Sequence, residues 1–81
     1  MRIKVRLLAP LIFSDGTDWV ELDVPPNGRV EELIGVVAGR SNIDKYGQDQ
    51  VMVLIGDKIA GPNDPLSENI EVRLMLRPMG G

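Results

Sequence analysis

The sequence contains no cysteine and no histidine. Without cysteine the chain forms no disulfide, and it offers neither a thiol nucleophile nor a thiolate metal ligand. Without histidine it lacks the side chain that most often serves as general base and as metal ligand. No nucleophile, base or cofactor motif then remains to support a small enzyme. We therefore expect no catalytic residue, no metal site and no bound cofactor in this chain.

Long apolar runs and blocks of one charge are also missing. No stretch reaches the ~18 apolar residues of a membrane span, and the N-terminus lacks the apolar segment of a signal peptide. We therefore expect a cytoplasmic protein without a membrane partner. The net charge is −3, from 9 basic and 12 acidic residues, which disfavours nucleic-acid binding because phosphates require a concentrated basic surface. Such a protein is better suited to protein partners.

Apolar and polar residues alternate in the first part of the chain, which is typical of half-buried strands. The segment "RIKVRLLAP" predicts one strand and "WVELDVPP" predicts another, joined by a hairpin loop over 10–17. The residues expected to face the core are Ile3, Val5, Leu7, Val20, Leu22 and Val24. With 81 residues, the chain can build one domain around one small core.

A helix is predicted next, because apolar residues recur with the spacing of one helix face. These residues are Val30, Leu33, Ile34 and Val37. We expect Asn27 to cap the N-terminus of this helix, since its side-chain oxygen can accept from a free N–H. Gly39 is suited to the C-terminal end. A polar loop is expected over 41–50.

The remaining segments "VMVLIG", "KIA" and "IEVRLML" predict strands, so the element order is β-β-α-β-(β)-β. The helix provides the long crossover that parallel neighbours need, so the first and last strands are expected to pair in parallel at the centre. This order predicts an α+β fold of the β-grasp type, with a mixed sheet of four to five strands and one main helix on one face. We assign residues 1–77 to this domain and residues 78–81 to a flexible C-terminal tail.

The chain resembles the ubiquitin-like sulfur carriers of the MoaD and ThiS families over nearly its whole length. The residues that carry this resemblance are "IKVRLLAP", the helix "VEELI", the half "VMVLIGDKIAGPNDPLSENIEVRLMLRPMGG" and above all the final Gly80-Gly81. Members of these families often end nearer to "PPVxGG". Here the tail is Arg77-Pro78-Met79-Gly80-Gly81.

This resemblance implies that the carboxylate of Gly81 is the reactive group. An E1-like adenylyltransferase would adenylate it, using ATP that binds to that partner. A sulfur donor such as a cysteine desulfurase or rhodanese would then convert it to a thiocarboxylate. The carrier would donate this sulfur to molybdopterin, thiazole or tRNA thiolation. Further partners implied are the large subunit of molybdopterin synthase or a thiazole synthase.

Two other functions remain open besides that of a sulfur carrier. The chain could be a ubiquitin-like modifier joined through Gly81 to lysines of target proteins, or a plain β-grasp binding module whose tail has no role. The chemistry of the tail suits the sulfur carrier and the modifier equally. Glycine has no Cβ and accepts both signs of φ, so Gly80 and Gly81 fit a narrow channel of an activating enzyme. Pro78 fixes its own φ and stiffens the exit from the sheet, so that Pro78 and Met79 position the tail.

A partner interface is predicted on the sheet face away from the helix. Met52, Leu54 and Met75 share that face if the last strands pair as expected, and exposed apolar patches often mark interfaces. Arg73 and Arg77 are candidates for contacts with acidic groups of the activating enzyme. The alternative is that other segments cover the apolar residues and that water solvates the arginines.

Overall fold

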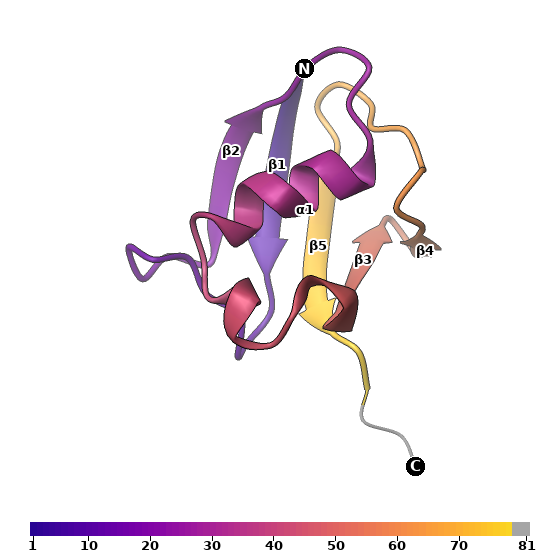
Figure 1. The fold of residues 1–81 in the computed structure, drawn as a ribbon. Coiled ribbons are helices and arrows are strands. Elements are labelled where there is room, and N and C mark those ends of the chain that lie inside the picture. The colour runs from indigo at the N-terminus through magenta and orange to yellow at the C-terminus, as the bar shows by residue number, and fades with distance from the viewer. Residues whose placement is uncertain (79–81) are drawn as a thin grey trace.

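The structure is a computed structural model that describes residues 1–78. One α-helix lies across one face of a five-stranded mixed sheet with strand order β2-β1-β5-β3-β4 (Figure 1). The strands are β1 (Arg2–Leu7), β2 (Trp19–Asp23), β3 (Val51–Ile55), β4 (Lys58–Ala60) and β5 (Glu71–Leu76). The helices are α1 (Val30–Ala38) and two short 3-10 helices, η1 (Ile43–Lys45) and η2 (Gln48–Gln50). The β-grasp fold predicted from the sequence is confirmed.

The parallel pair at the centre of the sheet consists of the first and last strands. Val5 lies beside Val72 and Leu7 beside Leu74 in the β1–β5 ladder. β2 pairs with β1 in antiparallel fashion, and β3 pairs in the same way with both β5 and β4. The predicted parallel pairing of β1 with β5 is confirmed. It is possible because the crossover through α1 lets two segments that are distant in sequence run in the same direction.

The core fills the layer between the sheet and α1. The residues that the alternation assigns to this layer are buried or half-buried, and Ile3, Val5 and Leu33 have no exposed surface. Phe13 and Leu11, from the loop after β1, are also buried and close the edge of the core. Complete burial of one such apolar side chain contributes roughly 1.5–3 kcal/mol.

The N-terminus of α1 differs from its prediction. The helix begins at Val30, so the expected cap Asn27 lies too early. Instead, the N–H of Val30 donates to the carbonyl oxygen of Asp64 over 3.0 Å. The N–H of Glu31 donates to the carbonyl oxygen of Pro62 over 2.9 Å. A loop distant in sequence therefore satisfies the free N–H groups that a local side chain was expected to cap.

The segment between α1 and β3 is more ordered than the predicted polar loop. It forms η1 and η2, and the side chain of Ile43 is completely buried beneath them. One apolar residue among nine polar or small ones gives no periodic signal, so the sequence did not reveal this anchor. Within residues 1–78, no helix has the length and the hydropathy required to span a lipid bilayer.

Candidate functional site

The sheet face opposite α1 presents an apolar patch over its central strands. Met52 of β3 lies beside Met75 of β5, and Leu54 of β3 lies beside Ile59 of β4. Leu8 extends the alternation of β1 on this face, and its N–H donates to the carbonyl oxygen of Leu74 over 2.9 Å. We call the five residues Leu8, Met52, Leu54, Ile59 and Met75 the sheet-face patch. Ile59 is the most accessible of them, with 66% of its surface exposed.

Arginine side chains border this patch. Arg73 lies beside Leu54 in the β3–β5 ladder, and its Nη2 donates to the carbonyl oxygen of Gly56 over 2.9 Å. Arg6 lies on the other side of β5 and pairs with Glu71 over 3.2 Å. The bond to the turn after β3 holds the Arg73 guanidinium next to the apolar side chains. The patch therefore combines an apolar centre with a cationic rim, as at many protein interfaces.

The base of the C-terminal tail is attached to η2. The N–H of Arg77 donates to the carbonyl oxygen of Gln50 over 2.8 Å, and its Nε donates to the carbonyl oxygen of Asp49 over 3.0 Å. Gly47 has a φ of +102°, which sets the direction in which η2 begins. A glycine suits this position because side-chain residues rarely adopt such a φ. The two bonds fix where the chain leaves the sheet.

A hollow of about 210 Å³ lies beside this attachment, lined by Tyr46, Gln50, Leu76 and Arg77. Pro78 follows directly and is exposed. The remaining tail residues proposed for function, Met79, Gly80 and Gly81, lie outside the described residues. The structure thus places the start of the tail at the end of β5, next to β3 (Figure 1).

The predicted interface residues are brought together in large part. Met52, Leu54, Met75 and Arg73 share one face. Arg77 lies at the end of the same strand, but its Nε is bonded to η2. Leu8 and Ile59 belong to this face although the sequence pattern gave no sign of it. Leu8 follows Leu7 without alternation, and the short segment "KIA" gave no signal for which of its side chains faces outward.

Within residues 1–78, no group of three or more acidic side chains is arranged to hold a metal ion. The sheet-face patch and the arginines at its border are suited to protein contacts.

The chain is similar to known proteins in structure but not in sequence. No protein-family model matches the chain, and no curated protein matches it by sequence. The putative molybdopterin converting factor subunit 1 from Pyrococcus furiosus matches with a TM-score of 0.75 and 22% identity, over 94% of this chain and 97% of that one. Small archaeal modifier protein 1 from Haloferax volcanii matches with a TM-score of 0.73 and 18% identity, over 93% and 95%.

A third match comes from the complex of subunits 1 and 2 of molybdopterin-converting factor from Helicobacter pylori. It has a TM-score of 0.70 and 16% identity, and it covers 100% of both chains. At these identities the similarity establishes the fold, which is that of ubiquitin-like β-grasp proteins. The resemblance to the MoaD/ThiS-like ubiquitin-fold proteins is thereby confirmed at the level of the fold.

Proposed function

We propose that this chain is a sulfur carrier whose reactive group is the carboxyl of Gly81. The observation that carries this proposal is the attachment of Arg77 to η2, which fixes where the chain leaves β5 just before the exposed Pro78. A partner that docks on the patch is then correctly placed to receive the tail. The fold shared with molybdopterin converting factor subunits supports this function.

The chemistry of the carrier requires a partner, because a carboxylate does not react with nucleophiles. In the proposed sequence the Gly81 carboxylate attacks the α-phosphorus of ATP on an E1-like adenylyltransferase, and pyrophosphate leaves. A sulfide equivalent from a sulfur donor then displaces AMP, which leaves a thiocarboxylate at Gly81. This chain supplies the carboxylate and the docking surface, while ATP and the catalytic groups belong to the partners.

A synthase-like acceptor is the second partner that we propose. In the complex from Helicobacter pylori, a chain with this fold is bound to subunit 2 of molybdopterin-converting factor. A comparable large subunit, or a thiazole synthase, would receive the sulfur from Gly81. The sheet-face patch is the surface that such a partner would cover.

A modifier function is the alternative, in which a lysine amine of a target displaces the activated terminus and forms an isopeptide bond. The similarity to a protein named small archaeal modifier protein 1 favours this candidate. Both functions use the same activation of Gly81, and they differ only in the nucleophile that follows. The products therefore distinguish them.

Mass spectrometry of the protein purified from its native host tests these proposals. A carrier is expected to show an intact mass raised by one oxygen-for-sulfur exchange, located in the C-terminal peptide. A modifier is expected to yield branched tryptic peptides in which the tail residues are attached to lysine. If neither product appears, and if deletion of Gly81 leaves the host phenotype unchanged, the terminus has no such role and the domain is a binding module.

A further inference from the structure

β2 is an edge strand whose outer backbone groups are free to bind. The ladder to β1 pairs Leu22 with Ile3 and Val20 with Val5. At one end of this ladder the N–H of Leu7 donates to the carbonyl oxygen of Asp18, and at the other end the N–H of Val24 donates to the carbonyl oxygen of Met1. In an antiparallel ladder, hydrogen-bonded pairs alternate with non-hydrogen-bonded pairs. The even-numbered residues of β2 therefore bond to β1, and the N–H and C=O groups of Trp19, Glu21 and Asp23 point away from it.

The ladder on the far side of β1 confirms this assignment. The N–H of Lys4, which lies opposite Glu21, donates to the carbonyl oxygen of Ile70 rather than to β2. The carbonyl oxygen of Arg2, opposite Asp23, accepts from Asn69 in the same direction. Three consecutive odd-numbered residues of β2 thus present a row of donors and acceptors at the edge of the sheet.

The opposite edge of the sheet does not offer a comparable row. β4 contains only the three residues Lys58–Ala60, whereas β2 contains the five residues Trp19–Asp23. Very short edge strands protect a sheet from further pairing. β2 is long enough to form a ladder with another segment, because strands of about five residues are common in stable sheets.

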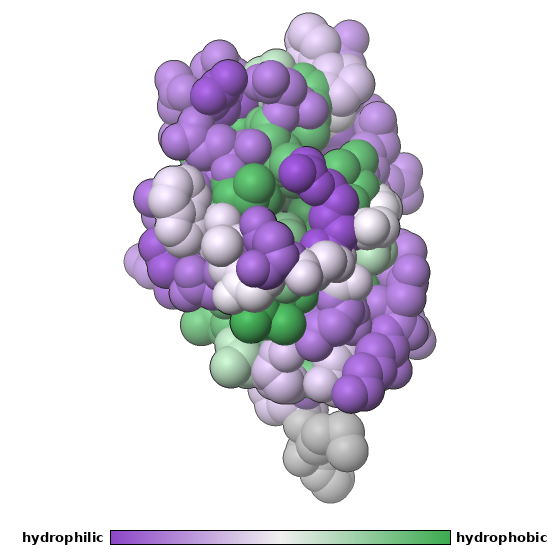
Figure 2. All heavy atoms as spheres, turned by 90° about the vertical axis from the view of Figure 1, so that its left-hand side faces the viewer, coloured by the Kyte–Doolittle hydropathy of each residue, from purple (hydrophilic) through white to green (hydrophobic). Residues whose placement is uncertain are grey.

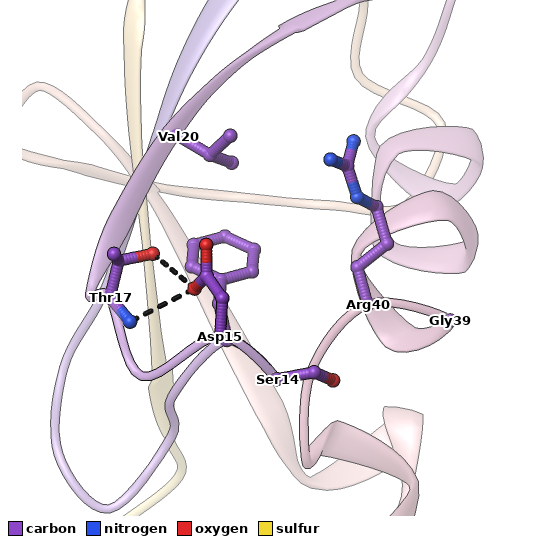
Figure 3. Close-up of a pocket in the computed structure, with 7 residues that line it drawn as sticks. Ser14, Asp15, Thr17, Val20, Gly39 and Arg40 are labelled. Atoms are coloured by element: carbon purple, nitrogen blue, oxygen red, sulfur yellow. Dashed lines mark hydrogen bonds between the residues drawn. The ribbon is translucent and has the colours of Figure 1, made fainter.

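The helix side of the β2 edge is hollowed and largely apolar. A cavity of about 310 Å³ opens beside Val20 and the buried Phe13. Figure 3 shows Arg40, at the end of α1, directed across this cavity toward Val20. Asp15 also lines this cavity. The pKa of the Asp15 carboxyl is lowered mainly by a hydrogen bond from the hydroxyl of Thr17, and next by one from the N–H of Thr17. Figure 2, which faces this side of the molecule, shows hydrophobic surface between polar side chains.

Two groups of opposite charge, Arg40 and Asp15, line the cavity on this inner side. Arg40 forms no ion pair with another residue of the described chain, although its charge contributes to lowering the pKa of the Asp15 carboxyl. A lysine or arginine that entered here would meet the Arg40 guanidinium as well as the Asp15 carboxylate, while an aliphatic side chain would cover Val20 and Phe13. The two charges together offer no net attraction for a basic side chain, so the inner side favours apolar side chains.

The outer side of the same edge has the opposite preference. Glu21 and Asp23 project from β2 on this face, and both share one cation, Arg2, over 3.2 and 3.6 Å. Asp18 and Glu71 similarly share Arg6 over 3.6 and 3.2 Å. All these side chains are substantially exposed, so the pairs are weak and water reaches the carboxylates. Lys4 lies opposite Glu21, with its Nζ 4.7 Å from the centroid of the Trp19 ring. The strip thus holds four acids, Asp18, Glu21, Asp23 and Glu71, and three cations, Arg2, Lys4 and Arg6, and this small excess of acids favours a basic neighbour.

We propose that the open edge of β2 is a docking site for an extended segment of a partner protein in which apolar and basic side chains alternate. The segment adds a sixth strand through the backbone groups of Trp19, Glu21 and Asp23. Its apolar side chains enter the cavity beside Val20, and its basic side chains lie next to Glu21 and Asp23. This interaction uses the backbone of β2, whereas most of the sheet-face patch lies on β5, β3 and β4, at the other side of the same sheet face.

A second copy of this chain fits the same edge poorly in the register that uses all three outward-facing residues. A two-fold antiparallel pairing of two β2 strands, centred on Glu21, would place Glu21 opposite Glu21. Like charges directly opposite one another destabilise a ladder. The acids therefore disfavour this self-pairing while they favour a basic segment.

An NMR titration of the isotope-labelled full chain tests the proposal. The probe is a capped peptide, slightly longer than β2, in which lysine alternates with valine. The matched control has the same composition, with its lysines grouped at one end. We expect the alternating peptide to bind at least about tenfold more tightly, since only it separates the two side-chain types onto two faces. The largest shifts are expected at the amides of Trp19, Glu21 and Asp23.

Two variants separate the backbone contribution from the charge. Glu21→Pro removes one outward N–H without breaking the ladder to β1, because proline is tolerated where the N–H of an edge strand faces solvent. It is expected to reduce affinity by about tenfold or more. Glu21→Gln keeps the backbone and is expected to reduce affinity about threefold and to weaken its dependence on salt.

Modified peptides provide the same test if Glu21→Pro does not fold. N-methylation of the residues whose N–H groups face β2 should abolish binding, while N-methylation of the alternate residues should have little effect. Equal binding of both methylated peptides would overturn the proposal, as would shifts confined to Leu54 and Met75. A concentration-dependent dimer that forms through β2 would also overturn it, because a second copy would then be the occupant.

Discussion

Arg77 connects the last strand to a helical turn that lies far from it in sequence. Its backbone N–H and its Nε both donate to carbonyl oxygens of η2. Considered as a sequence feature, Arg77 was a candidate for contact with an acidic partner. In the structure its Nε instead donates to η2, while its terminal nitrogens form no hydrogen bond to another residue within 1–78. The two bonds of this one residue thus fix where the chain leaves the sheet.

Replacement of Arg77 tests this positioning role. In Arg77→Ala the bond from Nε to Asp49 is lost, while the backbone bond to Gln50 remains possible. We expect the amide of residue 77 to exchange with solvent about tenfold faster, because a neighbouring contact no longer restrains local opening. The melting temperature should fall by only about 5 °C or less, since one exposed hydrogen bond contributes roughly 0.5–1 kcal/mol.

Hydrogen exchange measured by NMR provides this readout. Arg73→Ala is the matched control, because Arg73 donates to Gly56 at the opposite end of the sheet and has no contact with η2. The control should leave exchange at Arg77 unchanged. If Arg77→Ala also left it unchanged, the side chain would not restrain the base of the tail.

At the scale of elements, the segment between α1 and β3 is the least expected part of the fold. It consists of two single-turn 3-10 helices, which form few hydrogen bonds of their own. Their position depends on Ile43, which is completely buried against the core. Ser41 reinforces the connection, because its hydroxyl donates to the carbonyl oxygen of Val37 over 2.7 Å. The base of the tail is therefore supported by one apolar anchor beneath η1.

Removal of this anchor should destabilise the whole domain. Ile43→Ala is expected to lower the free energy of unfolding by about 3 kcal/mol, because it deletes buried methyl groups and leaves a cavity. Chemical denaturation followed by circular dichroism measures the change. Ile12→Ala is the control, since 42% of the surface of Ile12 is exposed and a loss below about 1 kcal/mol is expected. Equal losses in both variants would show that Ile43 is no anchor.

At the scale of the whole molecule, the β-grasp fold separates surfaces with different chemistry. The helix covers one face of the sheet (Figure 1), and the opposite face carries the sheet-face patch. The start of the tail lies beside this patch, at the end of β5. The open edge of β2 lies at the other side of the sheet, two strands away from β5 and without contact with β3. A partner that activates the tail and one that pairs with β2 therefore need not compete.

The double variant Leu54→Ser, Met75→Ser tests the sheet-face patch. We expect its affinity for the adenylating partner isolated from the native host to fall at least about tenfold, because apolar residues at the centre of an interface contribute most to binding. Isothermal titration calorimetry measures this affinity. Val36→Ser is the control, since Val36 is 46% exposed on the helix that covers the opposite face. Unchanged affinity in a folded double variant would place the interface elsewhere.

Much of this architecture was predictable because strands and helices leave periodic signals. The alternation around Val5 and Val20, and the helical spacing from Val30 to Val37, follow directly from the geometry of the two backbones. The pairing of β1 with β5 followed from the length of the crossover between them. The side on which Met52, Leu54 and Met75 lie was then fixed by the two-residue period of the strands.

Other features depend on groups that are distant in sequence and meet only in the folded chain. The N-terminus of α1 is capped by carbonyl oxygens near Asp64, the 3-10 segment is held by Ile43, and Arg77 is bonded to η2. No local pattern announces such contacts, because each depends on where a second segment comes to rest.

The sequence by itself therefore determined the order of the elements, the core-facing side of the strands and of α1, and the chemical character of the tail. These properties follow from periodicity and residue type, which act locally along the chain. Only the tertiary structure decided which backbone groups of β2 remain open, which cation faces the cavity beside Val20, and where the tail begins. Those outcomes depend on strand register and on long-range hydrogen bonds, which are defined only once the whole sheet has formed.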